Sequence, residues 1–215
     1  MDYAVPTAAD LADVNSLNRA LLGALQGSHG EPLQRALPAS CRAAVASLTE
    51  LQIERLAGLP FLLFSLHEQD DLYWEELLDD DPHRDLFVVN DAVTEDHSRL
   101  GAAAIGFAWQ LARRNPYTAR LVCGASLAWC ERLASRPLLD VLLRAVDRSD
   151  LLIPRQADNE DFWQRLLGAG LSAESNVRRA AHLSALHVIL TTVGGQYRRR
   201  LPSAACRAAV PTISM

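Results

Sequence analysis

Residues 100–134 read LGAAAIGFAWQLARRNPYTARLVCGASLAWCERLA, and this stretch decides the fold class. Leu and Ala, which favour helix, dominate it, and its apolar residues recur every three or four positions, as on one face of a helix. The Asn115-Pro116 step interrupts the pattern, because proline breaks helices. The stretch predicts two helices, over about 91–114 and about 117–134. The second is apolar on two sides, which places it at the centre of the fold.

The same periodicity continues on both sides of this stretch, together with helix start and stop signals. Residues 32–37 are expected to be a turn and residues 151–154 a linker. The further predicted helices cover about 7–26 with a capped start at Thr7 and Asp10, about 40–57, about 137–147, a short segment after Asp158, and Ser172 to about 193, where Gly194-Gly195 stops the last helix.

Two short apolar runs are ambiguous, since a buried strand and the start of a buried helix have the same pattern. For residues 61–66 we favour a helix that continues into the acidic segment, because Leu66, Tyr73 and Leu77 extend one helical face. Residues 86–89 are the best strand candidate of the chain. No partner strand is evident and a lone strand is unstable, so we interpret them as an extended linker.

These elements predict an all-α fold, an irregular multi-helix bundle of about eight helices. We expect a single helical domain over 1–195, with a possible N-terminal subdomain over 1–85. Residues 196–215 are expected to form a basic, loosely ordered tail. A chain of 215 residues can bury one sizeable core without metal or disulfide support.

The four cysteines form no CxxC pair and no Cys/His spacing typical of zinc sites. Cys123 and Cys130 are seven residues apart on one helix face, which indicates small apolar core residues. The sequence starts with Met1-Asp2-Tyr3 and shows no basic segment followed by an apolar one, so nothing marks it for export. We therefore expect a reduced, cytoplasmic protein.

Charge is unevenly distributed along the chain. The formal net charge is −5, but residues 67–99 alone carry −10, and the last 41 residues carry +6 without any acidic side chain. We expect these regions to face each other, within one chain or across a dimer, or to meet separate charged partners; the alternative is two solvated faces that never meet. All 21 basic residues are Arg, which excludes mechanisms that need a Lys nucleophile.

The acidic segment contains the candidate metal ligands. On a helix, His67 and Asp71 are four residues apart, and Glu68, Asp71 and Glu75 lie along one face, as the ligands of a hard metal ion would. The repeated Glu-x-x-His pairs of di-iron bundles and the His-Glu-x-x-His motif of metallopeptidases are absent from the sequence. We favour a solvated acidic face, and keep a helical metalloprotein or metal-dependent enzyme as one alternative and a partner-docking patch as another.

Motifs of covalent catalysis and phosphate binding are also absent: the sequence has no Gly-x-Ser-x-Gly elbow and no Walker loop. His182 and His187 are five residues apart and point in different directions on a helix, so we expect core or boundary histidines. We assign no catalytic residue and no cofactor, and a non-catalytic protein is the preferred interpretation.

Aromatic and arginine side chains near helix ends supply the candidate partner-binding residues. Trp109 lies on the side of its helix opposite Phe107 and Leu111, and Arg113 follows four residues later on the same face. Trp and Arg are enriched among the residues that dominate protein interfaces. The full set is Trp109, Arg113, Arg114, Tyr117, Arg198, Arg199 and Arg200.

We therefore hypothesise a cytoplasmic, non-catalytic interaction or regulatory protein that acts through helical surfaces. Its partner is expected to be another protein or a second copy of the chain in a homodimer. A nucleic-acid-associated regulator that uses the C-terminal arginines is a further alternative, which the negative net charge disfavours. No apolar run approaches the roughly 20 residues of a membrane helix, so no membrane partner is expected.

Overall fold

The computed structural model describes residues 5–27, 31–79, 95–145 and 148–200. Over these residues the protein has the all-α, multi-helix fold that the sequence predicts, with one minor sheet of two short strands. The helices of the described residues are α1 (Ala8–Gln26), α2 (Glu31–Ala36), α3 (Ala39–Ala46), α4 (Glu50–Ala57), α5 (Asp71–Asp79), α6 (Glu95–Arg114), α7 (Pro116–Cys123), α8 (Leu127–Ser135), α9 (Leu138–Ala145), α10 (Glu160–Leu167), the short 3₁₀ helix η2 (Ala169–Leu171) and α11 (Ser175–Arg200); the strands are β1 (Phe64–Ser65) and β2 (Ile153–Pro154).

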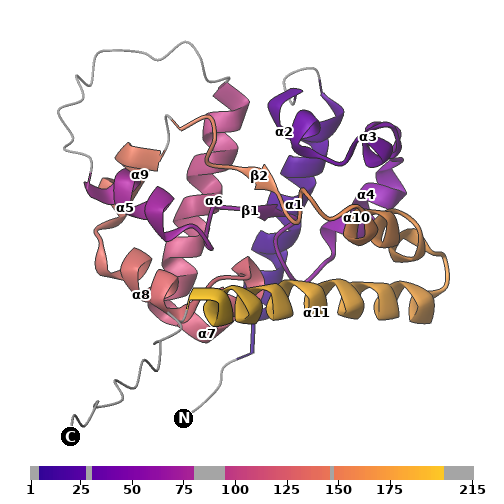
Figure 1. Cartoon of the computed structure of the whole chain (residues 1–215). Helices are drawn as coiled ribbons and strands as arrows, with labels where there is room; N and C mark the ends of the chain where they lie inside the picture. Colours follow the sequence, from indigo (N-terminus) through magenta and orange to yellow (C-terminus); the bar gives the residue numbers. More distant parts are fainter. Residues whose placement is uncertain (1–4, 28–30, 80–94, 146–147, 201–215) are drawn as a thin grey trace, which may run out of the picture.

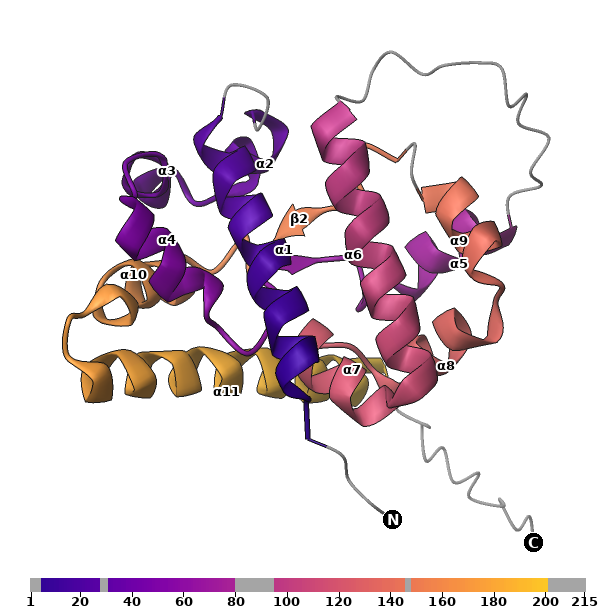
Figure 2. The same cartoon turned by 180° about the vertical axis from the view of Figure 1, so that it is seen from behind.

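The two short strands lie between two groups of helices. β1 and β2 pair antiparallel, with Phe64 opposite Pro154 and Ser65 opposite Ile153. On one side of this pair lie α3, α4 and α10, and on the other side lie α5, α8 and α9 (Figure 1). Helix α1 packs against both α4 and α6 and so joins the two sides. Helix α11 packs on α10 and η2 and runs along the base of the molecule in both views (Figure 2).

Buried tryptophans fix the segments that flank the strands. The Trp74 indole nitrogen donates a hydrogen bond to the carbonyl of Leu66 at 3.0 Å, and the Trp163 indole nitrogen donates to the carbonyl of Arg155 at 2.9 Å. Trp74 also packs edge-on against Trp129, with 5.4 Å between ring centroids. Each strand is thus held from its own group of helices, which sets the relative position of the two groups.

Helix α1 begins where the sequence predicts. The Thr7 side chain accepts a hydrogen bond from the Asp10 backbone N–H, and the Asp10 side chain accepts one from the Thr7 backbone N–H, which together form a capping box. The predicted helices over 91–114 and 137–147 correspond to α6 and α9. These confirmed elements all depend on local signals.

The predicted helix over 40–57 is wrong, because the chain forms two shorter helices there, α3 and α4. Thr49 starts α4 with a second capping box, in which Gln52 is the reciprocal partner. The side chains of Thr49 and Gln52 satisfy backbone groups at the start of α4. The predicted helix is therefore interrupted in front of Thr49. Residues 32–37 differ as well, since most of this predicted turn belongs to α2.

The predicted continuous helix over 117–134 is also wrong. α7 ends at Gly124, whose φ of +63° is left-handed, and Ser126 starts α8 by accepting a hydrogen bond from the Trp129 backbone N–H. Left-handed backbone strongly favours glycine. The apolar pattern continues through this break because Ala125 is buried as well. Periodicity alone therefore does not show that the chain turns here.

Residues 61–66 are not helical: Phe64–Ser65 forms β1, and the predicted linker 151–154 supplies the partner strand β2. The buried side chain of Asn18 explains part of this difference. Its amide nitrogen donates to the Phe61 carbonyl at 2.9 Å, and its oxygen accepts from the Leu63 backbone N–H at 2.8 Å. These bonds satisfy the buried backbone of the extended segment, and the next helix, α5, starts only at Asp71.

At the C-terminal side, α11 continues through Gly194-Gly195 to Arg200, so the predicted stop near 193 is wrong. The extended linker predicted at 86–89 lies outside the described residues, as does the boundary of the possible subdomain over 1–85. The single domain over 1–195 stays a prediction. The described helices of the N-terminal stretch pack against C-terminal elements, α3 on α10 and α4 on η2.

Candidate functional site

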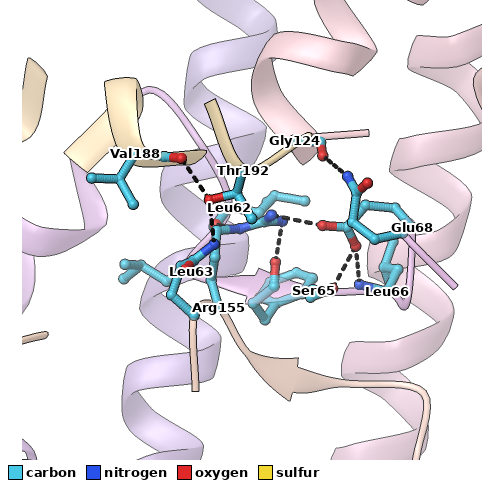
Figure 3. A network of polar contacts seen from close by, with 12 residues as sticks. Leu62, Leu63, Ser65, Leu66, Glu68, Gly124, Arg155, Val188 and Thr192 are labelled. Atoms are coloured by element: carbon cyan, nitrogen blue, oxygen red, sulfur yellow. Dashed lines mark hydrogen bonds and ion pairs between the residues drawn. The ribbon is translucent and has the colours of Figure 1, made fainter. Parts of the chain in front are cut away.

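Arg155 and Glu68 form a buried ion pair beside the two strands (Figure 3). One guanidinium nitrogen of Arg155 (Nη1) donates to Glu68 Oε1 at 2.7 Å, and Nε donates to the Leu62 carbonyl at 2.6 Å. The other terminal nitrogen donates to the Phe64 carbonyl. Both charged side chains are almost completely buried. Arg155 therefore ties the end of β2 to β1 and to the loop that follows β1.

The second oxygen of Glu68 completes this network. Glu68 Oε2 accepts hydrogen bonds from the Ser65 hydroxyl at 2.6 Å and from the Leu66 backbone N–H at 2.7 Å. Both oxygens of the carboxylate are thus engaged within the protein (Figure 3). The neighbouring Gln69 amide donates to the Gly124 carbonyl, which connects the loop to the break between α7 and α8. Such fully satisfied buried networks rigidify a fold.

The other candidate metal ligands lie apart from Glu68. The His67 ring stacks on Tyr73, with 4.1 Å between centroids, and its Nε2 donates to the carbonyl of Asp150 at 2.7 Å. Asp71 and Glu75 approach the guanidinium group of Arg132 on α8, at 3.7 and 4.0 Å. Within the described residues, His, Cys, Asp and Glu side chains form no group of three that could hold a metal ion.

The described cysteines and His182 have structural positions, whereas the expected core or boundary position is wrong for His187. Cys123 and Cys130 are buried, as predicted, and burial raises the pKa of both thiols, that of Cys130 to about 12. A thiol in this state is a poor nucleophile. His182 is half-buried and donates to the Gly170 carbonyl at 3.2 Å, and burial lowers its pKa. His187 is exposed.

The space between α10 and α11 is too small for a typical organic ligand. A hollow of about 130 Å³ is lined there by residues that include Asp161, Arg165 and Ser184. Ligand pockets usually enclose about 300–1,000 Å³.

The two arginines at the end of α6, Arg113 and Arg114, have different partners. Arg113 lies over the Trp109 ring, 4.8 Å from its centroid, as expected for residues four apart on one face. The Trp109 indole nitrogen donates to the Arg136 carbonyl at 2.8 Å, just before α9. Trp109 is partly buried, so it is not the fully exposed side chain that its position opposite Leu111 allowed. It joins α6 to the start of α9.

Arg114 faces the other way and forms an ion pair with Asp10 on α1. Burial by itself would raise the pKa of the Asp10 carboxyl, but hydrogen bonds from Arg114 and Thr7 outweigh it and hold this pKa below its ordinary value of 3.8. Tyr117 is exposed at the start of α7. Arg198, Arg199 and Arg200 belong to the last turns of α11, and their side chains lie outside the described part of the structure.

Replacing Arg114 by Gln is expected to lower the free energy of unfolding by about 1 kcal/mol at neutral pH, since half of this side chain is exposed. The folded-state pKa of Asp10 lies below the unfolded one, so its stabilisation is complete above pH 3.8 and is lost as the pH falls through the folded-state value. Urea unfolding should therefore show a smaller difference between wild type and variant in acid. Arg179→Gln, at an exposed arginine of α11, is the control, and an unchanged difference at all pH values would contradict the assignment.

Helix α9, which begins two residues after the Arg136 carbonyl that Trp109 contacts, exposes two leucines that are not among the predicted partner-binding residues. Leu139 and Leu143 are one helical turn apart and are 67% and 47% exposed, whereas Val141 and Ala145 of the same helix are buried. The run Leu138-Leu139-Asp140-Val141-Leu142-Leu143 has more leucines than one buried stripe requires. This excess of leucines is the sequence signal from which exposed apolar positions on the helix could have been predicted. We call Trp109, Arg113, Leu139 and Leu143 the α9 face.

None of the described helices is long and apolar enough to span a membrane. No family model, no curated protein and no solved structure matches the chain.

Proposed function

We propose that the protein is a non-catalytic interaction protein that binds a protein partner through the α9 face. The observation that carries this proposal is the exposure of Leu139 and Leu143 side by side on one helix. Scattered exposed leucines are common on protein surfaces. Leu139 and Leu143 instead stand one helical turn apart. Trp109 and Arg113, which lie near the start of α9, are of the residue types that are enriched at interface centres.

The α9 face is also held rigidly, which lowers the entropic cost of binding. Asp140 and Arg144 form an ion pair along α9 at 2.8 Å. At its start, α9 is connected to α6 through the hydrogen bond from Trp109 to the Arg136 carbonyl. At its end, the Arg148 backbone N–H donates to the Ala145 carbonyl. We propose that the protein acts in the cytoplasm, a location supported by the free thiols of its three described cysteines.

The test is affinity capture with the wild-type chain and two variants as bait. Leu139→Glu with Leu143→Glu places charges in the α9 face, and Leu183→Glu is the matched control, because Leu183 is 57% exposed on α11. Helix α11 runs along the base of the molecule, away from α9 (Figures 1 and 2). Glu is a good helix former, so both variants should fold. We expect a stoichiometric partner that wild type and control retain and the α9 variant loses; identical binding by all three baits would contradict the proposal.

A further inference from the structure

We infer that the hollow between α10 and α11 binds a small free amino acid with an aliphatic side chain, recognised through its ammonium and carboxylate groups together. The inference goes beyond the proposed function, because no residue that lines the hollow belongs to the α9 face. It depends on three features of the hollow, which are its two opposite charges, its apolar surface and its small size.

Two side chains of opposite charge line the hollow without neutralising each other. Asp161 and Arg165 are one helical turn apart on α10, a spacing at which Asp and Arg commonly form an ion pair. Asp140 and Arg144 have the same spacing on α9, and they do pair, at 2.8 Å. Among the described residues, the side chains of Asp161 and Arg165 form no ion pair and no hydrogen bond. Both charges are therefore available to a ligand.

A dipolar ligand suits this pair of charges better than a simple ion does. Arg165 repels a cation and Asp161 repels an anion, whereas a zwitterion is attracted at both of its ends. The Cα atoms of the two residues are about 6 Å apart along the helix, so both side chains can reach one small molecule.

Ser184 supplies a third polar group from the opposite helix. It lines the hollow from α11, and its hydroxyl has no hydrogen-bond partner among the residues that the structure describes. A serine hydroxyl can donate to the carboxylate of the ligand. A ligand held by Asp161, Arg165 and Ser184 would therefore connect α10 to α11.

The remaining surface of the hollow is mainly apolar. Phe162 and Ala185 are 3% and 5% exposed, and Val188 packs against the core. Such a surface suits an aliphatic side chain beside a few polar groups. The volume of about 130 Å³ equals that of about four water molecules at about 30 Å³ each. This size favours amino acids such as alanine and valine over larger ones.

The first experiment titrates the isotope-labelled full chain with L-alanine and with L-valine and follows the backbone amide signals by nuclear magnetic resonance. We expect at least one of them to saturate a single site with a Kd of about 1 mM or lower, and to shift the amide signals of Phe162 and Ala185. No saturation by either amino acid at concentrations up to about ten times that Kd would overturn the inference.

Two analogues test whether both charges of the ligand are recognised. N-acetyl-L-valine lacks the ammonium group and L-valinamide lacks the carboxylate, so each loses a charge-assisted contact. Each should bind at least about tenfold more weakly than L-valine. If either analogue binds as tightly as L-valine, the site recognises a single charge, such as that of a peptide end, and the inference is wrong.

Variants of the chain locate the site. Asp161→Asn and Arg165→Gln should each weaken binding at least about tenfold, whereas Asp13→Asn and Arg179→Gln, at exposed positions on α1 and α11, should leave it unchanged.

Ser184→Gln keeps both charges but places a longer side chain in the hollow, and it should also weaken binding. Glutamine is a good helix former, so this variant should fold, which circular dichroism checks. Binding that stays at the wild-type level in Asp161→Asn, Arg165→Gln and Ser184→Gln would overturn the inference. Capture of a protein through the α9 face does not use the hollow, so either proposal can fail without the other.

Discussion

Replacement of Arg155 by alanine is expected to lower the free energy of unfolding by about 3–5 kcal/mol, the usual effect of breaking a buried ion pair. The variant leaves the Glu68 carboxylate buried without its cation and removes the donors to the carbonyls of Leu62 and Phe64. Urea unfolding followed by circular dichroism measures the change. At this size the loss is a large part of the stability of a typical domain.

Two further variants serve as comparisons for Arg155→Ala. Arg19→Ala removes an ion pair with Glu50 whose side chains are 41% and 70% exposed, and should cost less than about 1 kcal/mol. The double variant Glu68→Gln with Arg155→Met removes both charges and should be more stable than Arg155→Ala, because no unpaired charge remains buried. Equal effects of Arg155→Ala and Arg19→Ala would show that the central network does not anchor the strands.

Gly124→Ala is expected to destabilise the protein by about 2–4 kcal/mol, for two separate reasons. The residue has φ +63°, where a Cβ atom is strained. The added Cβ would also lie 2.6 Å from Ile189 Cγ2 and 2.7 Å from a terminal guanidinium nitrogen (Nη1) of Arg155. The substitution therefore moves α11 or disturbs the buried ion pair, and thermal or urea unfolding measures the loss.

Gly23→Ala is the matched control for this substitution. Gly23 lies within α1, and an added Cβ has no other atom within 4 Å. Alanine is favoured over glycine inside a helix by about 0.5–1 kcal/mol, so this variant should be more stable than wild type. The same chemical change thus has opposite signs at the two positions. Destabilisation of similar size at both would contradict the roles assigned to the left-handed backbone and to the close contacts.

Some helices are determined by contacts between residues that are close in sequence, and these helices could be predicted from local sequence signals. Thr7 with Asp10 marks the start of α1, and the periodic apolar residues mark α6 and α9. The break before α4 also had a local signal, since Thr49 and Gln52 have the spacing of a capping box. The predicted helix over 40–57 followed the apolar pattern alone and was therefore too long.

The strands could not be predicted from short stretches of sequence, because the contacts that stabilise them are made with residues far away along the chain. Residues 61–66 are not helical, because Phe61 and Leu63 bind Asn18 and Phe64–Ser65 pairs with Ile153–Pro154. Neither contact is visible in a short window of sequence. The same holds for the central network. Glu68 was selected as a candidate metal ligand because of its neighbours in the sequence, whereas its partner Arg155 is 87 residues away.

The candidate site was predicted in part. The spacing of Trp109 and Arg113 correctly indicates that the two side chains meet. The assignment of α9 residues to a buried or an exposed position depends on how α9 packs against α5 and α6. Leu139 and Leu143 could therefore be identified as exposed only once these neighbours were placed.

The contacts between the N-terminal helices and the C-terminal elements have a consequence for how the chain folds during its synthesis. α3, α4 and α2 pack on α10, η2 and β2, all of which come after residue 150. A ribosome therefore completes α2, α3 and α4 long before it has synthesised the segments that cover them. The middle of the chain, α5 to α9, has most of its partners nearby in sequence and can assemble first. Because long-range closure slows folding and prolongs the exposure of apolar surface, we expect the N-terminal helices to become protected last and to depend most on chaperones during synthesis.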